Sequence, residues 1–110
     1  MITSPSPLRH YEIISGISGR MLAAARADQW DDVVVLGEEY QAAVEALRNL
    51  KSLNDDDRAA RRELLAKILD DDANIRLLAT PELARLGALL GNMKRQHSLL
   101  QAYLAPSLNP

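Results

Sequence analysis

The sequence predicts an all-α protein: four antiparallel amphipathic helices packed as a bundle, in a single domain over residues 1–110. Leu, Ile, Val, Ala and Met recur at three- and four-residue intervals along most of the chain, which is the period of an amphipathic helix. Aromatic residues make up only 4% of the sequence, whereas β-sheets draw on aromatic and β-branched side chains. The segments between the periodic stretches are short, and short connections favour antiparallel neighbouring helices.

The first helix is expected over residues 7–26. Ser6 supplies a hydroxyl for the N-cap, and Pro7 occupies a position where no backbone donor is needed. The apolar residues that share one face are Leu8, Tyr11, Ile14, Ile17 and Met21. Gly16 and Gly19 either weaken this helix or allow a neighbouring helix to approach closely.

The second helix is expected over residues 29–50. Asp28 is the expected N-cap, and Asp31 places negative charge near the positive end of the helix. Its apolar stripe consists of Val33, Leu36, Tyr40, Val44 and Leu47. The three consecutive valines at 33–35 would also suit a strand, but the helical period on both sides outweighs them.

The third helix is expected over residues 55–78. Asn54 is its N-cap, and the acidic residues 55–57 fill the first turn, where carboxylates interact favourably with the helix dipole. The apolar face is wider than one stripe and contains Leu64, Leu65, Ile68, Leu69, Ile75 and Leu78. A face of this width suits a helix that packs against two neighbours, or against one neighbour and a binding partner.

The fourth helix is expected over residues 81–104, with Thr80 as N-cap and Pro81 in the first position. The link to the third helix is so short that the fourth helix is expected to pack loosely or splay. Its seam consists of Leu83, Leu86, Leu90, Met93, His97, Leu100 and Leu104. A seam of this length could also pair with a second copy as a homodimer. Residues 1–6 and 105–110 are expected to be frayed tails.

Composition and motifs point away from catalysis, cofactors and nucleic acid. The chain has no Cys and a formal net charge of −2, so it offers no thiolate metal site and no general attraction to phosphate backbones. No apolar run approaches the ~20 residues needed for membrane insertion, and residues 1–8 lack a signal-peptide core. No phosphate loop or nucleophile motif is present. We therefore expect a cytoplasmic protein that is not an enzyme and binds no metal.

Two groups of titratable residues leave alternatives open. His97 lies among the leucines of the fourth helix, either as a pH-sensitive or partner contact or, as we favour, as a partly hydrated seam position. The run Asp70-Asp71-Asp72 is read as a solvated helix face, with a polar rim beside a binding groove as the alternative. The basic residues Arg85, Lys94 and Arg95 could attract that acidic run if the fourth helix folds back on the third.

Several segments resemble the FliT family of flagellar export chaperones. Trp30-Asp31 opens the second helix in the same way, and Ile68-Leu69-Asp70 and Leu77-Leu78 match in the third. The most specific matches, in the fourth helix, are Leu86, Leu89-Leu90-Gly91, Arg95-Gln96, Ser98-Leu99 and Ala102-Tyr103. The order and lengths of the helices also agree. The acidic run at 70–72 and Pro81 depart from the family pattern and leave groove polarity and hinge behaviour open.

The resemblance implies a cofactor-free protein that binds the filament-cap protein FliD and keeps it from assembling before export. It also implies possible antagonism of the master activator FlhDC and contact with components of the export apparatus. The implied partner-binding residues are Val44, Leu47, Leu65, Ile68, Asp72 and Arg76. The last helix, 81–104, would cover that surface as a regulatory helix through Arg85, Lys94, Arg95 and Tyr103. The alternative is a generic helical interaction or anti-activator module without a chaperone role.

Overall fold

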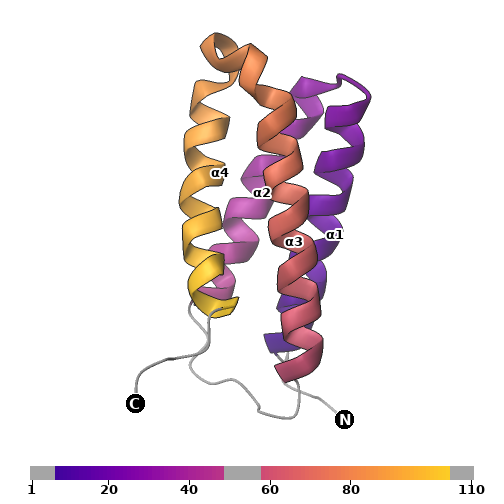
Figure 1. Ribbon diagram of the computed structural model, residues 1–110, viewed down its shortest axis with the longest axis vertical. Coiled ribbons are helices and arrows are strands. Elements are labelled where there is room, and N and C mark those ends of the chain that lie inside the picture. Colours follow the sequence, from indigo (N-terminus) through magenta and orange to yellow (C-terminus); the bar gives the residue numbers. More distant parts are fainter. Residues whose placement is uncertain (1–6, 49–57, 105–110) are drawn as a thin grey trace.

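Helices make up nearly all of the chain that the computed structural model describes, which is residues 7–48 and 58–104 (Figure 1). The elements are α1 (Pro7–Arg26), α2 (Trp30–Arg48), α3 (Arg58–Ala79), the 3-10 helix η2 (Thr80–Glu82) and α4 (Leu83–Leu104). The prediction of an all-α fold with four helices is confirmed. The expected cap at Asn54, the acidic turn 55–57 and both expected tails lie outside the described residues.

The helices form a ring in which α1 and α4 are each flanked by both α2 and α3. In Figure 1, α1 and α3 run upward and α2 and α4 run downward. Although α2 and α3 are consecutive in the sequence, they lie diagonally opposite each other in the ring. The expectation that a short connection makes them neighbours is wrong. Residues 49–57 connect them, and a segment of this length reaches up to about 30 Å when extended, enough to cross one end of a bundle.

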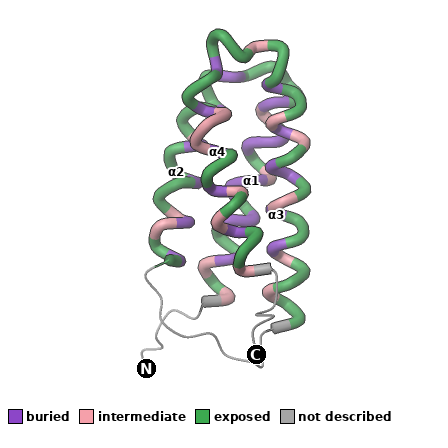
Figure 2. Tube along the Cα trace, turned by 60° about the vertical axis from the view of Figure 1, so that its left-hand side comes forward, coloured by how far each residue is buried: buried purple, intermediate pink, exposed green. Residues whose placement is uncertain are grey.

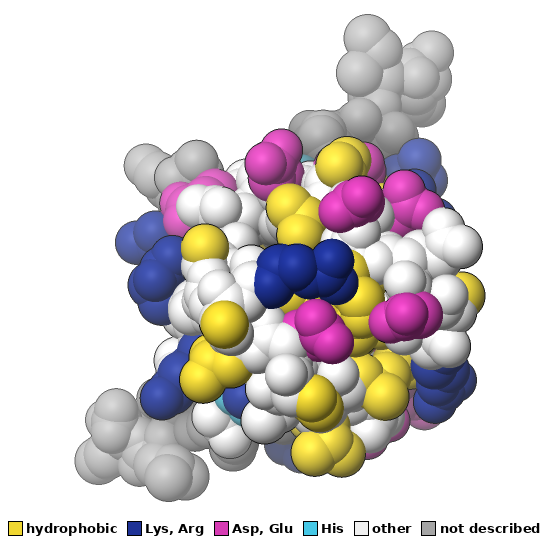
Figure 3. Space-filling view, turned by 90° about the horizontal axis from the view of Figure 1, so that it is seen from above, with side chains coloured by type: hydrophobic (Ala, Val, Ile, Leu, Met, Phe, Trp, Pro, Cys, Tyr) yellow, Lys and Arg dark blue, Asp and Glu magenta, His cyan; other side chains and the backbone are white. Residues whose placement is uncertain are grey.

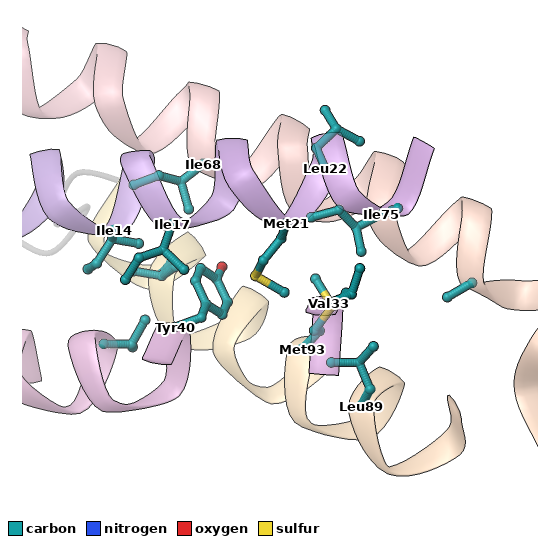
Figure 4. Close-up of a cluster of buried hydrophobic side chains, with 14 of the residues drawn as sticks. Ile14, Ile17, Met21, Leu22, Val33, Tyr40, Ile68, Ile75, Leu89 and Met93 are labelled. Atoms are coloured by element: carbon teal, nitrogen blue, oxygen red, sulfur yellow. The ribbon is translucent and has the colours of Figure 1, made fainter. Parts of the chain in front are cut away.

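The core receives apolar side chains from every helix of the ring. Figure 4 shows Met21 of α1, Tyr40 of α2, Ile75 of α3 and Met93 of α4 directed into one shared space. The expected stripes of α1 and α2 are confirmed, with Leu8 and Leu36 at their margins only partly buried. Buried positions follow the inner sides of the helices and exposed positions the outer sides (Figure 2).

Asp28 ends α1 rather than beginning α2, which corrects its expected role as an N-cap. Its φ of 61° is left-handed. The amide of Asp28 bonds to the carbonyl of Ala25 at 3.0 Å, and that of Gln29 bonds to Ala24 at 2.8 Å. This is the Schellman pattern, whose left-handed position usually holds Gly. The Asp28 carboxylate accepts a hydrogen bond from Trp30 Nε1 at 2.8 Å, so it orients the first side chain of α2.

The chain turns from α3 into α4 within the three residues of η2, which confirms the very short link expected here. Pro81 lies in the first turn of η2, and Thr80 Oγ1 donates to the carbonyl of Arg76 at 2.8 Å. The turn is completed inside α4, where Leu86 departs from helical geometry with φ −109° and ψ 19°. The regular part of α4 therefore begins only after Leu86.

The fourth helix is not splayed, because α4 packs along both α3 and α2. The side chains that it buries are Leu86, Leu89, Met93, Gln96 and Leu100. The expected seam is thus partly wrong in register: Leu83 is 61% exposed, while Leu89 and Gln96 face inward. The kink at Leu86 explains the exposure of Leu83, because it rotates the first turn of α4 away from the face that follows.

Candidate functional site

The residues expected to bind a partner lie mostly inside the bundle. The apolar members of the set are all buried: Val44, Leu47, Leu65 and Ile68. Asp72 is also fully buried, and the side chain of its neighbour Arg76 is 28% exposed. With α4 in place these residues form core rather than an open groove. Their role in binding a partner stays a prediction, and it now requires α4 to move.

The wide apolar face of α3 is only partly used by the protein itself. Leu64 and Leu69, at the sides of the face, are half-buried against the core. Leu77 is 71% exposed and Leu78 is 41% exposed, and Leu83, which follows η2 in the sequence, is exposed as well. Figure 3 looks down on this end of the bundle, where apolar side chains reach the surface between charged ones. The surplus apolar surface of α3 therefore lies at the corner with α4, not along a groove.

Asp72 connects α3 to α4 from inside the bundle. Its Oδ2 atom lies 2.9 Å from Arg76 Nε and 2.8 Å from Nδ1 of His97 on α4. Arg76 Nη2 is also 3.3 Å from His97 Nδ1, but a ring nitrogen that donates its proton to Asp72 cannot also accept one. The favoured description of His97 as a partly hydrated seam position is incomplete, because the ring makes a polar contact between two helices.

Several buried polar atoms lack hydrogen-bond partners within the described part of the chain. Among them are the hydroxyl of Tyr40, Oδ1 of Asp72 and Oε1 of Gln96. Burial raises the pKa of Asp72, while the charge of Arg76 and hydrogen bonds from Arg76 and His97 oppose the rise. Burial, reinforced by the negative charge of Asp72, also raises the pKa of Tyr40 well above its usual range. The centre of the α3–α4 seam is thus polar and incompletely satisfied.

Asp71 makes a separate polar contact, between α3 and α1. Its Oδ2 atom lies 2.9 Å from Ser18 Oγ and 2.6 Å from Lys67 Nζ. Lys67 also donates to the carbonyl of Ser15 at 3.2 Å. A Cβ atom on Gly19 would lie 3.3 Å from Lys67 Nζ, so Gly19 leaves room for this lysine. Gly16, by contrast, faces open space.

The solvated-face interpretation of the acidic run is correct for Asp70 and wrong for Asp71 and Asp72. Asp70 is exposed, whereas Asp71 is 7% and Asp72 0% exposed. Consecutive helical residues point about 100° apart, so three in a row cannot all face water on a helix with two neighbours. Burial is tolerated because each carboxylate has a cationic partner, Lys67 or Arg76.

The expected regulatory residues lie on the outer side of α4 or at its end. Arg85, Lys94 and Arg95 are exposed, and Tyr103 is half-buried against the core. Within the described residues none of these three cations pairs with the acidic run, so the expected attraction is wrong. Arg85 instead lies 3.5 Å from Glu82.

Arg85 also borders two hollows on the surface. It faces a hollow of about 420 Å³ lined by the acidic residues Asp28, Asp31 and Asp32. Together with Arg95 it lines a groove of about 320 Å³ between α2 and α4. A Cβ atom on Gly37, in the wall of this groove, would lie 2.8 Å from Leu89 Cδ1. The two helices therefore approach closely where α2 has no side chain.

Sequence reasoning missed the Asp72–His97 contact. The pairing of Asp72 with Arg76 could be predicted, because the two are four residues apart on one helix and such pairs lie next to each other. The position of His97 beside Asp72 depends on which face of α4 meets α3, and periodicity alone does not determine that face. In the described ranges no three His, Cys, Asp or Glu side chains form a metal-binding group. No helix there is both long and apolar enough to cross a bilayer.

The fold and site define a small helical bundle whose last helix covers apolar residues of α2 and α3 through a partly polar seam. The family model described as "Flagellar protein FliT" matches residues 8–105. The chain therefore belongs to the FliT family of flagellar proteins, and this membership supports a flagellar role.

Individual relatives cover most of the chain. Flagellar protein FliT of Cronobacter sakazakii is 30% identical over 100 residues, which are 89% of this chain and 83% of that protein. The protein of the same name from Yersinia enterocolitica is 34% identical over 101 residues, covering 87% and 82%. That of Pectobacterium atrosepticum is 26% identical over 106 residues, covering 94% and 84%. No solved structure matches the chain significantly.

Proposed function

We propose that this protein is a cytoplasmic flagellar export chaperone that binds the filament-cap protein FliD and prevents its premature assembly. Membership of the FliT family supports a role in the flagellum. The observation that carries the proposal is the position of α4, which packs over α2 and α3. Apart from the polar contact at Asp72, the surface beneath it is apolar, and an uncovered surface of that kind invites either a partner or aggregation.

In this proposal a helical segment of FliD takes the place of α4. Amphipathic helices bind apolar grooves through side chains at intervals of three and four residues. The contact would be made by Val44, Leu47, Leu65 and Ile68. Asp72 and Arg76 would supply polar contacts once His97 has moved away. Because the client must displace α4, its affinity is lowered by the stability of the closed arrangement.

Two features of α4 support such a movement. Its contact with α3 is partly polar, and Oδ1 of Asp72 and Oε1 of Gln96 lack partners in the described residues. Each unsatisfied buried atom of this kind costs roughly 1–3 kcal/mol, so the seam is weaker than an apolar one of equal area. The turn at η2 and the departure from helical geometry at Leu86 also give α4 a place to pivot.

Calorimetric titration with the C-terminal helical segment of FliD tests this function. Deleting residues 80–110 is expected to raise the affinity, because the competing helix is gone. Circular dichroism establishes whether the truncated protein is folded before its affinity is compared. Unchanged or weaker binding by a folded truncation would count against regulation by α4, and absence of binding by both forms would count against the chaperone function.

A second candidate function is antagonism of the activator FlhDC. The observation that favours it is the exposed positive charge on α4, from Arg85, Lys94 and Arg95. Reversing the charge at Arg95 is expected to abolish binding to FlhDC while sparing binding to FliD, as measured by titration with each partner. If both interactions survive the Arg95→Glu substitution, α4 does not face the regulator.

Further partners follow from the same proposal. Components of the export apparatus are expected to associate with the chaperone, and direct contact with nucleic acid is not expected. A pulldown from flagellated cells, read by mass spectrometry, tests these expectations together. Recovery of neither FliD nor FlhDC would favour the alternative of a generic helical interaction module. Sedimentation of the purified chain tests whether it forms a homodimer.

A further inference from the structure

The outer surface of the bundle carries a groove between α2 and α4 that is separate from the covered apolar residues. Its volume is about 320 Å³. Its lining consists of Val34, Gly37, Glu38, Gln41, Arg85, Leu86, Ala88, Leu89, Asn92 and Arg95. The groove is open while α4 is packed in place, so an occupant needs no displaced helix. An inference about this groove therefore goes beyond the proposed chaperone function and does not rest on it.

The floor of the groove is apolar. Gly37 of α2 has no side chain and lies close against Leu89 of α4, which closes the bottom, while the small residue Ala88 of α4 is exposed beside it. Val34, which is 38% exposed, adds apolar surface at one side. This floor can accept a few apolar side chains but not a bulky folded surface.

The two rims of the groove carry opposite charges. Arg85 and Arg95 lie on the α4 side, and Glu38 lies on the α2 side beside Gln41. Within the described residues Arg95 and Glu38 make no ion pair, and Arg85 has only the exposed contact with Glu82 at 3.5 Å. These charges are therefore available to an occupant, and their arrangement gives the groove a basic flank and an acidic flank.

We propose that this groove binds an amphipathic helix of a partner protein, with apolar side chains on the floor and acidic side chains toward Arg85 and Arg95. Arg85 and Arg95 are ten residues apart in the sequence and lie on either side of the kink at Leu86, so an occupant that contacts both must extend lengthwise along α4. A helix fits better than a strand, because helical walls offer no free backbone edge to pair with a strand. Nucleic acid fits poorly, because Glu38 and the net charge of −2 oppose a phosphate backbone.

Because the groove has one wall from α2 and one from α4, an occupant contacts both helices at once. It therefore favours the arrangement in which α4 lies beside α2 over any arrangement in which they separate. The side chains of Arg85 and Arg95 select the charge on the flank of the occupant. The packing of Leu89 against Gly37 limits how deeply its apolar side chains can reach.

The test uses full-length protein and two synthetic amphipathic peptides of equal length. Both carry Leu at intervals of three and four residues, and one flank is Glu in the first peptide and Lys in the second. The acidic peptide is expected to bind more tightly, with amide shifts in heteronuclear NMR spectra confined to residues that line the groove. Binding of both peptides with equal affinity, or shifts located elsewhere, would overturn the proposal.

Charge reversal provides a matched pair of variants. Arg95→Glu is expected to lower the affinity for the acidic peptide about tenfold or more, and a tenfold loss corresponds to ~1.4 kcal/mol. Lys94→Glu makes the same change of charge at the neighbouring residue, which does not line the groove. It is expected to change the affinity for the acidic peptide less than about twofold, because an exposed charge outside the contact contributes little. Equal losses in the two variants would indicate general electrostatic attraction and would contradict a built groove.

Filling the floor provides an independent pair. Ala88→Trp places a large side chain in the groove and is expected to abolish binding of the acidic peptide. Ala102→Trp makes the same change at an exposed position of α4 outside the lining and is expected to leave binding intact. A second copy of this chain is the competing occupant: a dimer in sedimentation that dissociates on Arg95→Glu would show that the groove serves self-association, and the proposal would fail.

Discussion

At the scale of single residues, Asp72 shows how a charged group is accommodated inside a small bundle. It is fully buried and shares one oxygen between Arg76 and His97, while the other oxygen has no partner in the described residues. Burial raises its pKa above the ordinary value of 3.8. The folded protein therefore binds this proton more tightly than the unfolded chain does, and ionisation of Asp72 opposes folding.

The pH dependence of stability follows from the sign of that shift. A raised carboxyl pKa contributes stability that is fully present below the unfolded pKa and is lost as the pH rises through the folded pKa. The wild type is thus expected to lose stability relative to Asp72→Asn as the pH rises from about 4, so that the unfolding free energy of the wild type minus that of the variant falls. Urea denaturation across this range measures it. A difference that is flat or rises with pH would contradict the direction of the shift.

A matched substitution separates Asp72 from the rest of the acidic run. Asp70 is exposed and hydrogen-bonds only to Asn74, at 3.4 Å, among the described residues. Asp70→Asn is therefore expected to change the unfolding free energy at neutral pH by less than about 0.5 kcal/mol. An equal effect of Asp70→Asn and Asp72→Asn at that pH would mean that the charge of the run, and not burial, determines the effect.

The residue scale is also where the sequence was least informative. The i, i+4 spacing of Asp72 and Arg76 makes their pairing predictable. The pairing of Asp72 with His97 was not predictable, because the two lie on different helices and the contact depends on the rotation of α4. Asp28 likewise suits an N-cap by residue type, but its left-handed φ depends on how α1 meets α2.

At the scale of elements, the helices were predictable and their relative packing was not. The apolar periods of α1 and α2 identified most of their buried residues, because periodicity reports directly which side of a helix is apolar. The inward face of α4 was partly misassigned. Leu89 and Gln96 face inward beside Met93 and Leu100, and the three- and four-residue period alone does not decide between them and their neighbours Leu90 and His97. Leu83 was misassigned because the expected seam assumed one straight helix from Pro81. The departure at Leu86 changes the rotation of the first turn, and no residue type at that position signals it.

Glycine substitutions test the close approach of α2 and α4. Gly16→Ala has open space and is expected to stabilise the protein by up to ~1 kcal/mol through helix propensity. Gly37→Ala gains the same propensity but places Cβ 2.8 Å from Leu89 Cδ1, and overpacking of this kind typically costs about 1–3 kcal/mol. Thermal or chemical unfolding is expected to rank Gly37→Ala below Gly16→Ala. Equal stabilisation would mean that α2 and α4 are not in close contact.

Leucine truncation tests the core shared by the helices. Leu47 of α2 and Leu86 of α4 are 3% exposed, so replacement of either by Ala is expected to cost about 2–5 kcal/mol of unfolding free energy. Leu77 is 71% exposed, and Leu77→Ala should lie within about 0.5 kcal/mol of wild type. Chemical denaturation measures all three. A cost below ~0.5 kcal/mol at Leu47 or Leu86 would show that their stripes are not core.

At the scale of the whole molecule, the ring order of the helices determines which surface α4 can control. Because α2 and α3 are diagonal, their apolar residues face each other across the core, flanked by α1 and α4. Within residues 7–48 and 58–104, α2 and α3 are therefore not neighbours that could form an outer groove between them. The sequence predicted four helices and the FliT family, but the ring order depends on long-range packing that helical periods do not encode.

The central claim is that α4 competes with a client for the apolar residues of α2 and α3. Leu100→Ala removes a fully buried α4 side chain in the full-length chain, while Leu22→Ala removes a buried side chain of α1 as the control. Calorimetry with the C-terminal FliD segment compares the two. The Leu100→Ala variant is expected to bind this segment about tenfold more tightly than wild type for every ~1.4 kcal/mol by which the substitution destabilises the closed arrangement. The Leu22→Ala variant is expected to bind the segment no more tightly than wild type. Equal affinities in all three proteins would contradict the claim.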